Sequence, residues 1–229
     1  MESRARARAA IEAGGVRVDG HLAAKASELV EVTAEIAASA EHPWVSRAAL
    51  KLVHALDLWP IAVDGRTVLD VGASTGGFTE VCLARGAARV FAVDVGRDQL
   101  HARLRSDPRV TSLEATDARR LDRSLVRGPV DLIVCDASFI GLAKVLPAAL
   151  GLAGPGADLV ALVKPQFEVG PGRVGKGGIV RDAAAQAEAL QTAQAFIEGQ
   201  GWRVRQTAES PILGGDGNRE FLLWASLPA

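Results

Sequence analysis

A glycine-rich turn that follows a buried apolar run points most directly to chemistry in this sequence. From the strand onward the segment reads Val68-Leu69-Asp70-Val71-Gly72-Ala73-Ser74-Thr75-Gly76-Gly77-Phe78. Small residues let the backbone approach a ligand closely, and the unpaired first amides of a helix starting near Thr75 point at that ligand. The dinucleotide fingerprint G-x-G-x-x-G needs a second glycine where this turn has Ser74. The turn therefore predicts a nucleotide-type cofactor site without the dinucleotide spacing.

Two further apolar runs end in carboxylates. Asp94 closes the run that begins at Arg89, and Asp117 follows the run 110–113. A carboxylate at a strand end can hold both hydroxyls of a ribose, so we expect Asp94 to bind a ribose and Asp117 to meet an adenine edge. Each residue alone is explained as well by a strand-end turn. The series would also suit a dehydrogenase, so the spacing of the glycine turn is what separates the two readings.

Groups that could handle a proton lie at two later strand ends. Asp136 follows the apolar run 132–135, and Lys164 follows another apolar run just before Pro165. In isolation, Lys164 is explained equally well as a strand-end lysine that reaches out to solvent. Lys51, on the helix before the first strand, and Glu220, at the start of the last strand, add a second amine and a second carboxylate.

These motifs carry a family resemblance. The Asp-x-Gly-x-Ser-x-Gly turn resembles the S-adenosylmethionine (SAM) turn of class I methyltransferases, and the four proton-handling residues resemble the Lys-Asp-Lys-Glu tetrad of FtsJ/RrmJ-like ribose 2'-O-methyltransferases. Together with an S4-like N-terminus, the chain resembles the TlyA family over essentially its whole length. The additional matching segments are 46–52, 164–168 and 176–182.

The resemblance implies SAM-dependent 2'-O-methylation of cytidine in ribosomal RNA of the small subunit, the large subunit or both; the family also bears the name haemolysin. No metal is implied. The residues implied to bind SAM are Asp70, Gly72, Ser74, Thr75, Gly76, Gly77, Phe78, Asp94 and Asp117.

The tetrad makes chemical sense for that reaction. A ribose hydroxyl is a poor nucleophile and needs a base, whereas an ordinary lysine, with a reference pKa of about 10.4, is almost wholly protonated at neutral pH. A lysine base needs surroundings that favour the neutral amine by about 3 to 4 kcal/mol. We predict Lys164 as the base, Lys51 and Asp136 as its orienting and electrostatic partners, and Glu220 as a positioning carboxylate. Lys51 favours the neutral amine, and the carboxylates oppose it while orienting the amines.

Composition fixes the broad class. The 229 residues, 48% hydrophobic and 23% charged, suit one sizeable α/β domain with a small appendage. The net charge of -1 means that any nucleic-acid surface must come from local clustering of the 26 Lys and Arg. Cys82 and Cys135 read as small core residues rather than a disulfide or metal pair. The sequence lacks both an 18-residue apolar run and a signal-peptide core, so we expect a cytoplasmic protein without membrane contact.

The N-terminal segment has its own character. Residues 1–41 combine an Arg-studded helical stretch, a strand at 16–18, a turn at Asp19-Gly20 and an apolar alternation at 29–32. The segment 3–20 resembles the core of an S4 RNA-binding domain that lacks its first helix. Basic residues there could bind RNA phosphates or simply form a solvated face. A glycine-rich stretch at 170–178 is predicted to be a mobile loop over the acceptor site. The candidate RNA-binding residues are Arg4, Arg6, Arg8, Arg17, Lys25, Arg47, Arg173 and Lys176.

Behind a linker at 42–46, residues 47–229 alternate strands and helices. Apolar strands without polar alternation indicate a parallel sheet covered on both faces, here an α/β class I methyltransferase fold with an antiparallel last strand. Strands are expected near 67–71, 89–94, 110–113, 130–136, 158–164, 202–208 and 219–226. Helices are expected near 47–57, 76–86, 97–105, 141–151 and 183–199.

Three other functions remain open at this stage. The chain could methylate a small molecule or a protein, with the N-terminal module serving only stability or dimerisation. It could perturb membranes, although that would need a long apolar span or an amphipathic basic helix. It could bind RNA and SAM without catalysis, which the complete tetrad argues against.

Overall fold

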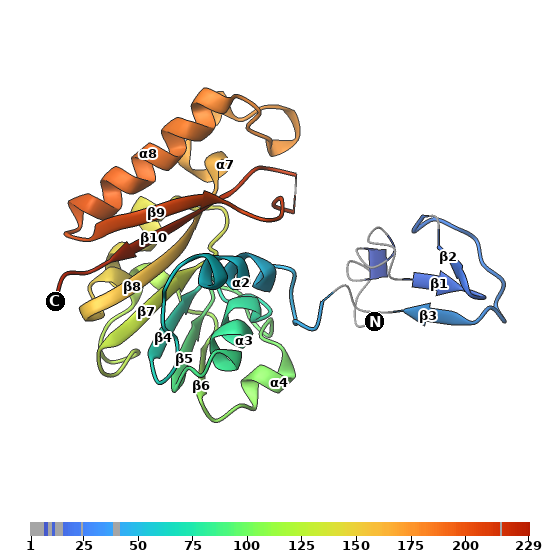
Figure 1. Cartoon of the computed structure of the whole chain (residues 1–229), viewed down its shortest axis with the longest axis horizontal. Helices are drawn as coiled ribbons and strands as arrows, with labels where there is room; N and C mark the ends of the chain where they lie inside the picture. The colour runs from blue at the N-terminus through green and yellow to red at the C-terminus, as the bar shows by residue number, and fades with distance from the viewer. Residues whose placement is uncertain (1–6, 9–10, 12–15, 24, 39–41, 216) are drawn as a thin grey trace. The chain divides into compact units, whose positions relative to one another are not determined.

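A computed structural model describes residues 7–8, 11, 16–23, 25–38, 42–215 and 217–229. The chain divides into two compact units, residues 1–43 and 44–229 (Figure 1). The division falls within the segment expected to be a linker, and Val45, just beyond it, is already buried in the larger unit.

The larger unit is built on a seven-stranded sheet with the order β6-β5-β4-β7-β8-β10-β9 (Figure 1). Strands β4 to β8 run parallel, and β10 pairs antiparallel with both β8 and β9. This confirms the predicted fold class, including its antiparallel edge. The strands are β4 (Thr67–Val71), β5 (Arg89–Val93), β6 (Val110–Leu113), β7 (Val130–Cys135), β8 (Ala153–Val163), β9 (Arg203–Glu209) and β10 (Phe221–Ser226).

Helices cover both faces of this sheet, which is why its central strands are apolar at nearly every position. In β4, Val68 packs in one core with α2 (Ala49–Leu58), α3 (Gly77–Ala84) and α4 (Ala102–Arg105). Leu69 and Val71 pack in the other core with α5 (Leu142–Val145), α6 (Pro147–Leu150) and α8 (Ala183–Gly199). Short elements complete the unit: η1 (Ala118–Arg120), α7 (Pro165–Glu168), η2 (Pro171–Arg173) and η3 (Lys176–Gly178).

The sheet order places a crevice at the carboxyl end of β4. The chain passes from β4 to β5 on one side, whereas β7 lies on the other side, and ligands of open α/β sheets bind where the order reverses in this way. Hydrogen bonds tie the loops together there: the amides of Gly72 and Ala73 donate to Val93, and the amide of Asp136 donates to Val71. The loops after β4, β5 and β7 therefore form one rigid rim.

Three predicted elements differ from the structure. The helix expected at 97–105 is only Ala102–Arg105, because Asp98 has a φ of 52° and Glu114 accepts bonds from the amides of Gln99 and Leu100, which fixes a turn. The helix expected at 141–151 is divided at Pro147, whose missing N–H interrupts the helical ladder. Strand β8 begins at Ala153 rather than near 158.

The smaller unit contains a three-stranded sheet of order β2-β1-β3, formed by β1 (Val16–Val18), β2 (His21–Leu22) and β3 (Ile36–Ala38). Asp19 and Gly20 both have positive φ in the β1–β2 turn, as expected for a two-residue hairpin. The alternation at 29–32 is not a strand: Leu29 and Val32 are 99% and 103% exposed, so period-two patterning there reflects no buried face. Within the described residues, no helix is both long and apolar enough to cross a membrane.

The contact between the β4 turn and the β7 loop yields a stability prediction. Gly72 has a φ of 84°, and a Cβ built on it would lie 2.8 Å from the Cα of Ala137, which is backbone and cannot swing aside. Gly128 has a nearly equal φ of 83° and open space around its Cβ position. We expect Gly128→Ala to lower the free energy of unfolding by about 1 kcal/mol. Gly72→Ala should lower it by a further 1 to 3 kcal/mol or so, measured by urea denaturation. Equal losses for both variants would contradict the proposed packing of the two loops.

Candidate active site

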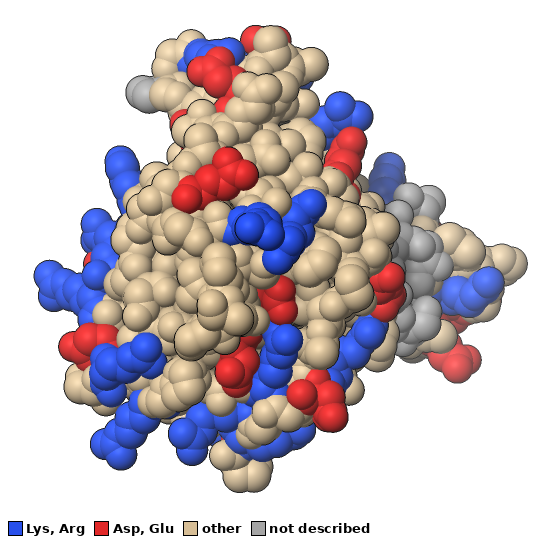
Figure 2. Space-filling model, turned by 60° about the vertical axis from the view of Figure 1, so that its left-hand side comes forward, with Lys and Arg blue, Asp and Glu red and all other residues tan. Residues whose placement is uncertain are grey.

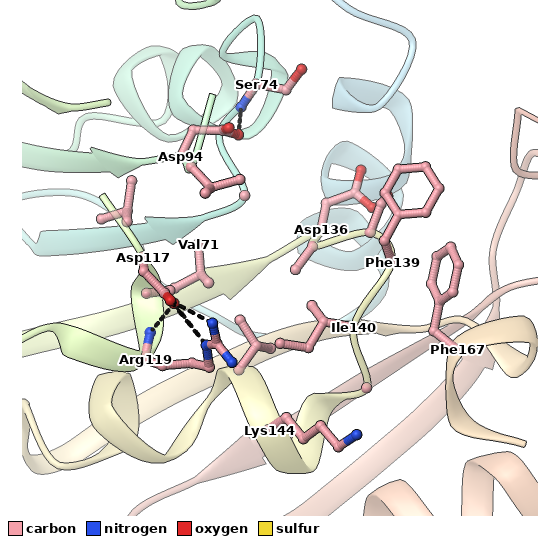
Figure 3. A pocket seen from close by; sticks show the side chains of 18 of the residues that line it. Val71, Ser74, Asp94, Asp117, Arg119, Asp136, Phe139, Ile140, Lys144 and Phe167 are labelled. Atoms are coloured by element: carbon pink, nitrogen blue, oxygen red, sulfur yellow. Dashed lines mark hydrogen bonds and ion pairs between the residues drawn. The ribbon is translucent and has the colours of Figure 1, made fainter. Parts of the chain in front are cut away.

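A large cavity of about 1190 Å³ opens at the crevice beyond β4, β5 and β7. Figure 3 shows its side chains arranged from Asp94 and Asp117 at one end to Phe139 and Phe167 at the other. This exceeds the roughly 300 to 1,000 Å³ of most small-molecule sites, so there is room for a nucleoside cofactor and for part of a second molecule.

Asp94 is oriented as a ribose-binding carboxylate would need to be. The amide of Ser74 donates to its Oδ2 at 2.8 Å (Figure 3), and the amide of Gly96 donates to its Oδ1 at 2.7 Å. The Ser74 amide reaches it because Gly72 and Ser74 adopt positive φ values of 84° and 46°, which fold the turn tightly. Each carboxylate oxygen keeps a further lone pair, so two ribose hydroxyls could still donate to it.

Asp117 lines the same cavity but already has a partner. The guanidinium of Arg119 donates to both carboxylate oxygens, at 2.9 Å from Nε to Oδ1 and 2.6 Å from Nη2 to Oδ2 (Figure 3). These bonds, with one from the Arg119 amide, lower the pKa of Asp117 to about 2. Asp117 is thus a firmly ionised acceptor, and Arg119 is a cavity residue that the sequence analysis missed.

Other predicted cofactor residues occupy different places. Gly72 and Ser74 line both cavities of the site, Gly77 and Phe78 line only the smaller one, and Thr75 and Gly76 line neither. Gly76 is the N-cap of α3, where a φ of 97° lets the chain enter the helix. Asp70 also lines neither cavity: it is fully buried behind the turn, where the hydroxyl of Thr79 donates to it at 2.7 Å.

The four proton-handling residues meet in a second cavity of about 290 Å³, which shares a wall with the first. The Nζ of Lys51 lies 2.6 Å from Oε2 of Glu220 and 3.7 Å from Oδ2 of Asp136. The other oxygen of Asp136 lies 2.7 Å from the Nζ of Lys164. The charges therefore alternate along one chain, Glu220, Lys51, Asp136, Lys164.

Because these four charged side chains are largely buried, each of them needs its partners. Lys51, Lys164 and Glu220 are 6%, 6% and 3% exposed, so none is well solvated. Removing one member would leave a partner charge in a poorly solvated place, which typically costs 3 to 5 kcal/mol or so. In β7, burial raises the pKa of the neighbouring Cys135 to about 12, so that thiol stays neutral beside the chain.

Two residues near the tetrad were not in the predicted site. The hydroxyl of Ser138 lies 2.8 Å from the Nζ of Lys164, although the sequence shows only a serine two positions after the acid. Phe139 is 89% exposed with a φ of 65°, and its ring lies 5.4 Å from that of Phe167 (Figure 3). An aromatic residue three positions after the strand-end acid Asp136 was the available signal for Phe139.

The predicted RNA-binding residues lie on both units. Arg4 and Arg6 lie outside the described residues. In the smaller unit, Arg8, Arg17 and Lys25 are exposed, and Arg17 donates to the carbonyl of Gly20. In the larger unit, Arg47 and Lys176 are exposed, whereas Arg173 pairs with Glu188 at 2.5 Å.

The glycine-rich stretch is fastened at its far end. The buried side chain of Asn218 accepts a bond from the amide of Val180 and donates to the carbonyl of Gly178. The described part of the chain holds no group of three His, Cys, Asp or Glu side chains placed to bind a metal ion.

The geometry fits an adenosine-bearing cofactor, because an oriented carboxylate, an acceptor beyond it and a close-packed glycine turn border one cavity. Comparison with known proteins shows the family. Residues 44–227 match the model of FtsJ-like methyltransferases, and residues 1–36 match the S4 domain.

Named relatives cover nearly the whole chain. The 16S/23S rRNA (cytidine-2'-O)-methyltransferase TlyA of Mycobacterium tuberculosis is 50% identical over 97% of this chain and 84% of its own length. Hemolysin A of Brachyspira hyodysenteriae is 38% identical over 96% of this chain and 92% of its own. A solved structure named "Putative hemolysin from Streptococcus thermophilus" is 39% identical, with a TM-score of 0.83 over 100% of this chain and 84% of that one.

Asp70 gives the site a pH-dependent stability. Burial, reinforced by the charge of Asp136 and opposed by the Thr79 bond, raises the pKa of Asp70 from 3.8 to about 7. An acid whose pKa is raised on folding favours the folded state below its unfolded pKa, and that contribution is lost as the pH rises towards 7. Above pH 7 the ionised carboxylate therefore costs about 4 kcal/mol.

We expect Asp70→Asn to stabilise the protein, by an increment that grows between about pH 4 and about pH 7 in urea denaturation and then levels off. The exposed Asp98→Asn serves as the control and should give a nearly constant difference. A stability increment for Asp70→Asn that does not depend on pH would show that folding does not raise the pKa of the Asp70 carboxyl.

Proposed function

Since the chain belongs to the FtsJ-like methyltransferase family and carries an S4 domain ahead of the methyltransferase domain, we propose that it transfers a methyl group from SAM to the 2'-hydroxyl of a cytidine in ribosomal RNA. The alternating chain of Glu220, Lys51, Asp136 and Lys164 beside the cofactor cavity carries this proposal. The name of the Mycobacterium relative supports the same acceptor and makes both ribosomal subunits candidates.

The residues divide into a cofactor set and a proton-handling set. When bound, SAM supplies an electrophilic methyl group on a sulfonium. Asp94 would hold its ribose, Asp117 its adenine, and the backbone around Gly72 and Ser74 the remainder of the molecule. The smaller cavity, which shares Asp136 and Ser138 with the larger one, would receive the acceptor ribose.

Lys164 then takes the proton of the 2'-hydroxyl. Asp136 orients the Lys164 amine but, as a carboxylate, also favours the ammonium form. Lys51 offsets this effect because its Nζ faces the other oxygen of Asp136 and draws on the same negative charge. Glu220 holds the Nζ of Lys51 at 2.6 Å. It therefore acts on Lys164 only indirectly, through Lys51 and Asp136.

Ribosomal RNA would be bound through contacts of Lys and Arg with its phosphates and through stacking of a nucleobase on an aromatic ring. Figure 2 shows Lys and Arg gathered along the lower margin of one face, interspersed with Asp and Glu, so the near-neutral total hides local positive surface. Arg8, Arg17 and Lys25 would add phosphate contacts from the smaller unit. Phe139 presents an exposed ring at the cavity mouth, and an unstacked nucleobase packs well on such a ring.

The central test is methyl transfer from labelled SAM to unmodified small and large ribosomal subunits. We expect label in 2'-O-methylcytidine with the wild type and none with Lys164→Ala, because Lys51, the other amine in this cavity, is held by Glu220 and Asp136. Affinity for SAM, measured by calorimetry, should change less than about twofold, since Lys164 lines the acceptor cavity and not the larger one.

Lys164→Arg is the matched control, because it keeps the positive charge but does not release a proton near neutral pH. It should also be inactive. Turnover by either variant at the wild-type rate would refute the assignment of the base, and label on neither subunit with the wild type would refute the substrate.

Stacking by Phe139 is tested separately. We expect Phe139→Ala to lower kcat/KM for the ribosomal subunit about tenfold or more, because base–aromatic stacking is worth about 1 to 3 kcal/mol. Phe139→Trp should retain most of the activity, with both variants assayed at saturating SAM because Phe139 also lines the larger cavity. Wild-type kcat/KM in Phe139→Ala would exclude a stacking role.

A further inference from the structure

The amine of Lys164 has three oxygen atoms around it, from only two residues. Asp136 supplies its carboxylate Oδ1 at 2.7 Å and its backbone carbonyl at 3.2 Å, and Ser138 supplies its hydroxyl at 2.8 Å. Both residues follow β7 and both line the acceptor cavity with Lys164. The two residues thus approach Nζ from one loop.

A lysine that works as a base has to aim its lone pair. The neutral amine has two N–H groups and one lone pair, and free rotation about the Cε–Nζ bond would spread that lone pair over all directions. The backbone carbonyl of Asp136 takes one N–H, while its carboxylate Oδ1 lies at ion-pair distance. If a second acceptor takes the other N–H, rotation stops and the lone pair keeps one direction.

We propose that Ser138 is this second acceptor, a positioning residue that holds the Lys164 amine with its lone pair towards the acceptor cavity. This inference rests on the proposed function, because Ser138 acts through the proposed base. Neither the sequence motif nor the names of the relatives assigns the residue a role.

The loop is built to hold Ser138 in place although the residue itself is exposed. On one side, Ala137 packs against Gly72, where even a Cβ would not fit. On the other side, Phe139 has a φ of 65°, and the amide of Leu142 donates to Glu168 at 2.8 Å. Burial raises the pKa of Glu168, because this carboxyl at the end of α7 is enclosed beside the loop that follows β7.

Replacing Ser138 changes no charge near the base. The ionisable groups facing Lys164 are Asp136 after β7, Lys51 on α2, Glu220 before β10 and the neutral thiol of Cys135 in β7. A serine hydroxyl that accepts a bond favours the ammonium form over the amine. Removing the Ser138 hydroxyl should therefore let Lys164 act as a base at lower pH. Transfer should also become slower, because the lone pair of the amine no longer keeps one direction.

The test is the pH profile of single-turnover methyl transfer to the ribosomal subunit that the wild type modifies, between about pH 6 and about pH 9. For Ser138→Ala we expect the plateau rate to fall about tenfold and the midpoint of the acid limb to move down by about one pH unit. Ser138→Thr keeps a hydroxyl and should restore both. Both variants are assayed at saturating SAM, because Ser138 also lines the larger cavity.

Ser106→Ala, at an exposed hydroxyl bonded to the carbonyl of Arg103, is the matched control and should keep the wild-type profile. An unchanged profile in Ser138→Ala overturns the inference, and so does a lower plateau with no shift or without recovery in Ser138→Thr, because local damage alone would give that result. An active Lys164→Ala, or no transfer by the wild type, instead overturns the proposed function.

Discussion

The site depends on one carboxylate placed between two buried lysines. Asp136 presents one oxygen to Lys164 at 2.7 Å and the other to Lys51 at 3.7 Å, while Glu220 balances Lys51 from its far side. None of these four charged side chains could be buried alone, because the free-energy cost of removing its charge from water would exceed the gain from any single contact. Since the four residues come from α2, the β7 loop, the end of β8 and the start of β10, their pairing requires the complete central sheet. Fold and chemistry are therefore coupled through Asp136.

The cofactor turn and the catalytic loop behave as one piece of structure. The amide of Asp136 donates to Val71, the last residue before the turn, and the missing Cβ of Gly72 leaves room for the backbone of Ala137. Asp136 and Ser138 line both cavities as a result. A displacement of a few tenths of an ångström in the turn would move the carboxylate that orients the base in the proposed mechanism. In that mechanism, close backbone packing links the placement of the methyl donor to that of the Lys164 amine.

Much of this arrangement could be predicted from the sequence, because strand ends in a parallel sheet meet at one edge and the residues there are distinctive. Asp94, Asp136 and Lys164 all lie where the strand pattern indicates. The pairing could not be predicted: the pattern places Lys51 and Lys164 in one site but does not say that Asp136 lies between them. The pattern also fails where side chains turn inward, as with Asp70, which packs on Thr79 behind the turn. Gln99, whose amide accepts from the Ser74 hydroxyl, has no sequence signal.

In the proposed function the two units have separate tasks. Among the described residues, those that line the two cavities all lie between Ser46 and Glu220, in the larger unit. That unit has a very small core, centred on Val16 and Ala23, and exposes basic side chains on short strands and turns. Phosphate contacts of this kind supply affinity without choosing a base. In the proposed function, selection of the nucleotide would come from RNA shape and from groups at the cavity mouth, where the rings of Phe139 and Phe167 lie together. The chemical step would instead depend on the buried charges and on the glycine turn that packs against the β7 loop.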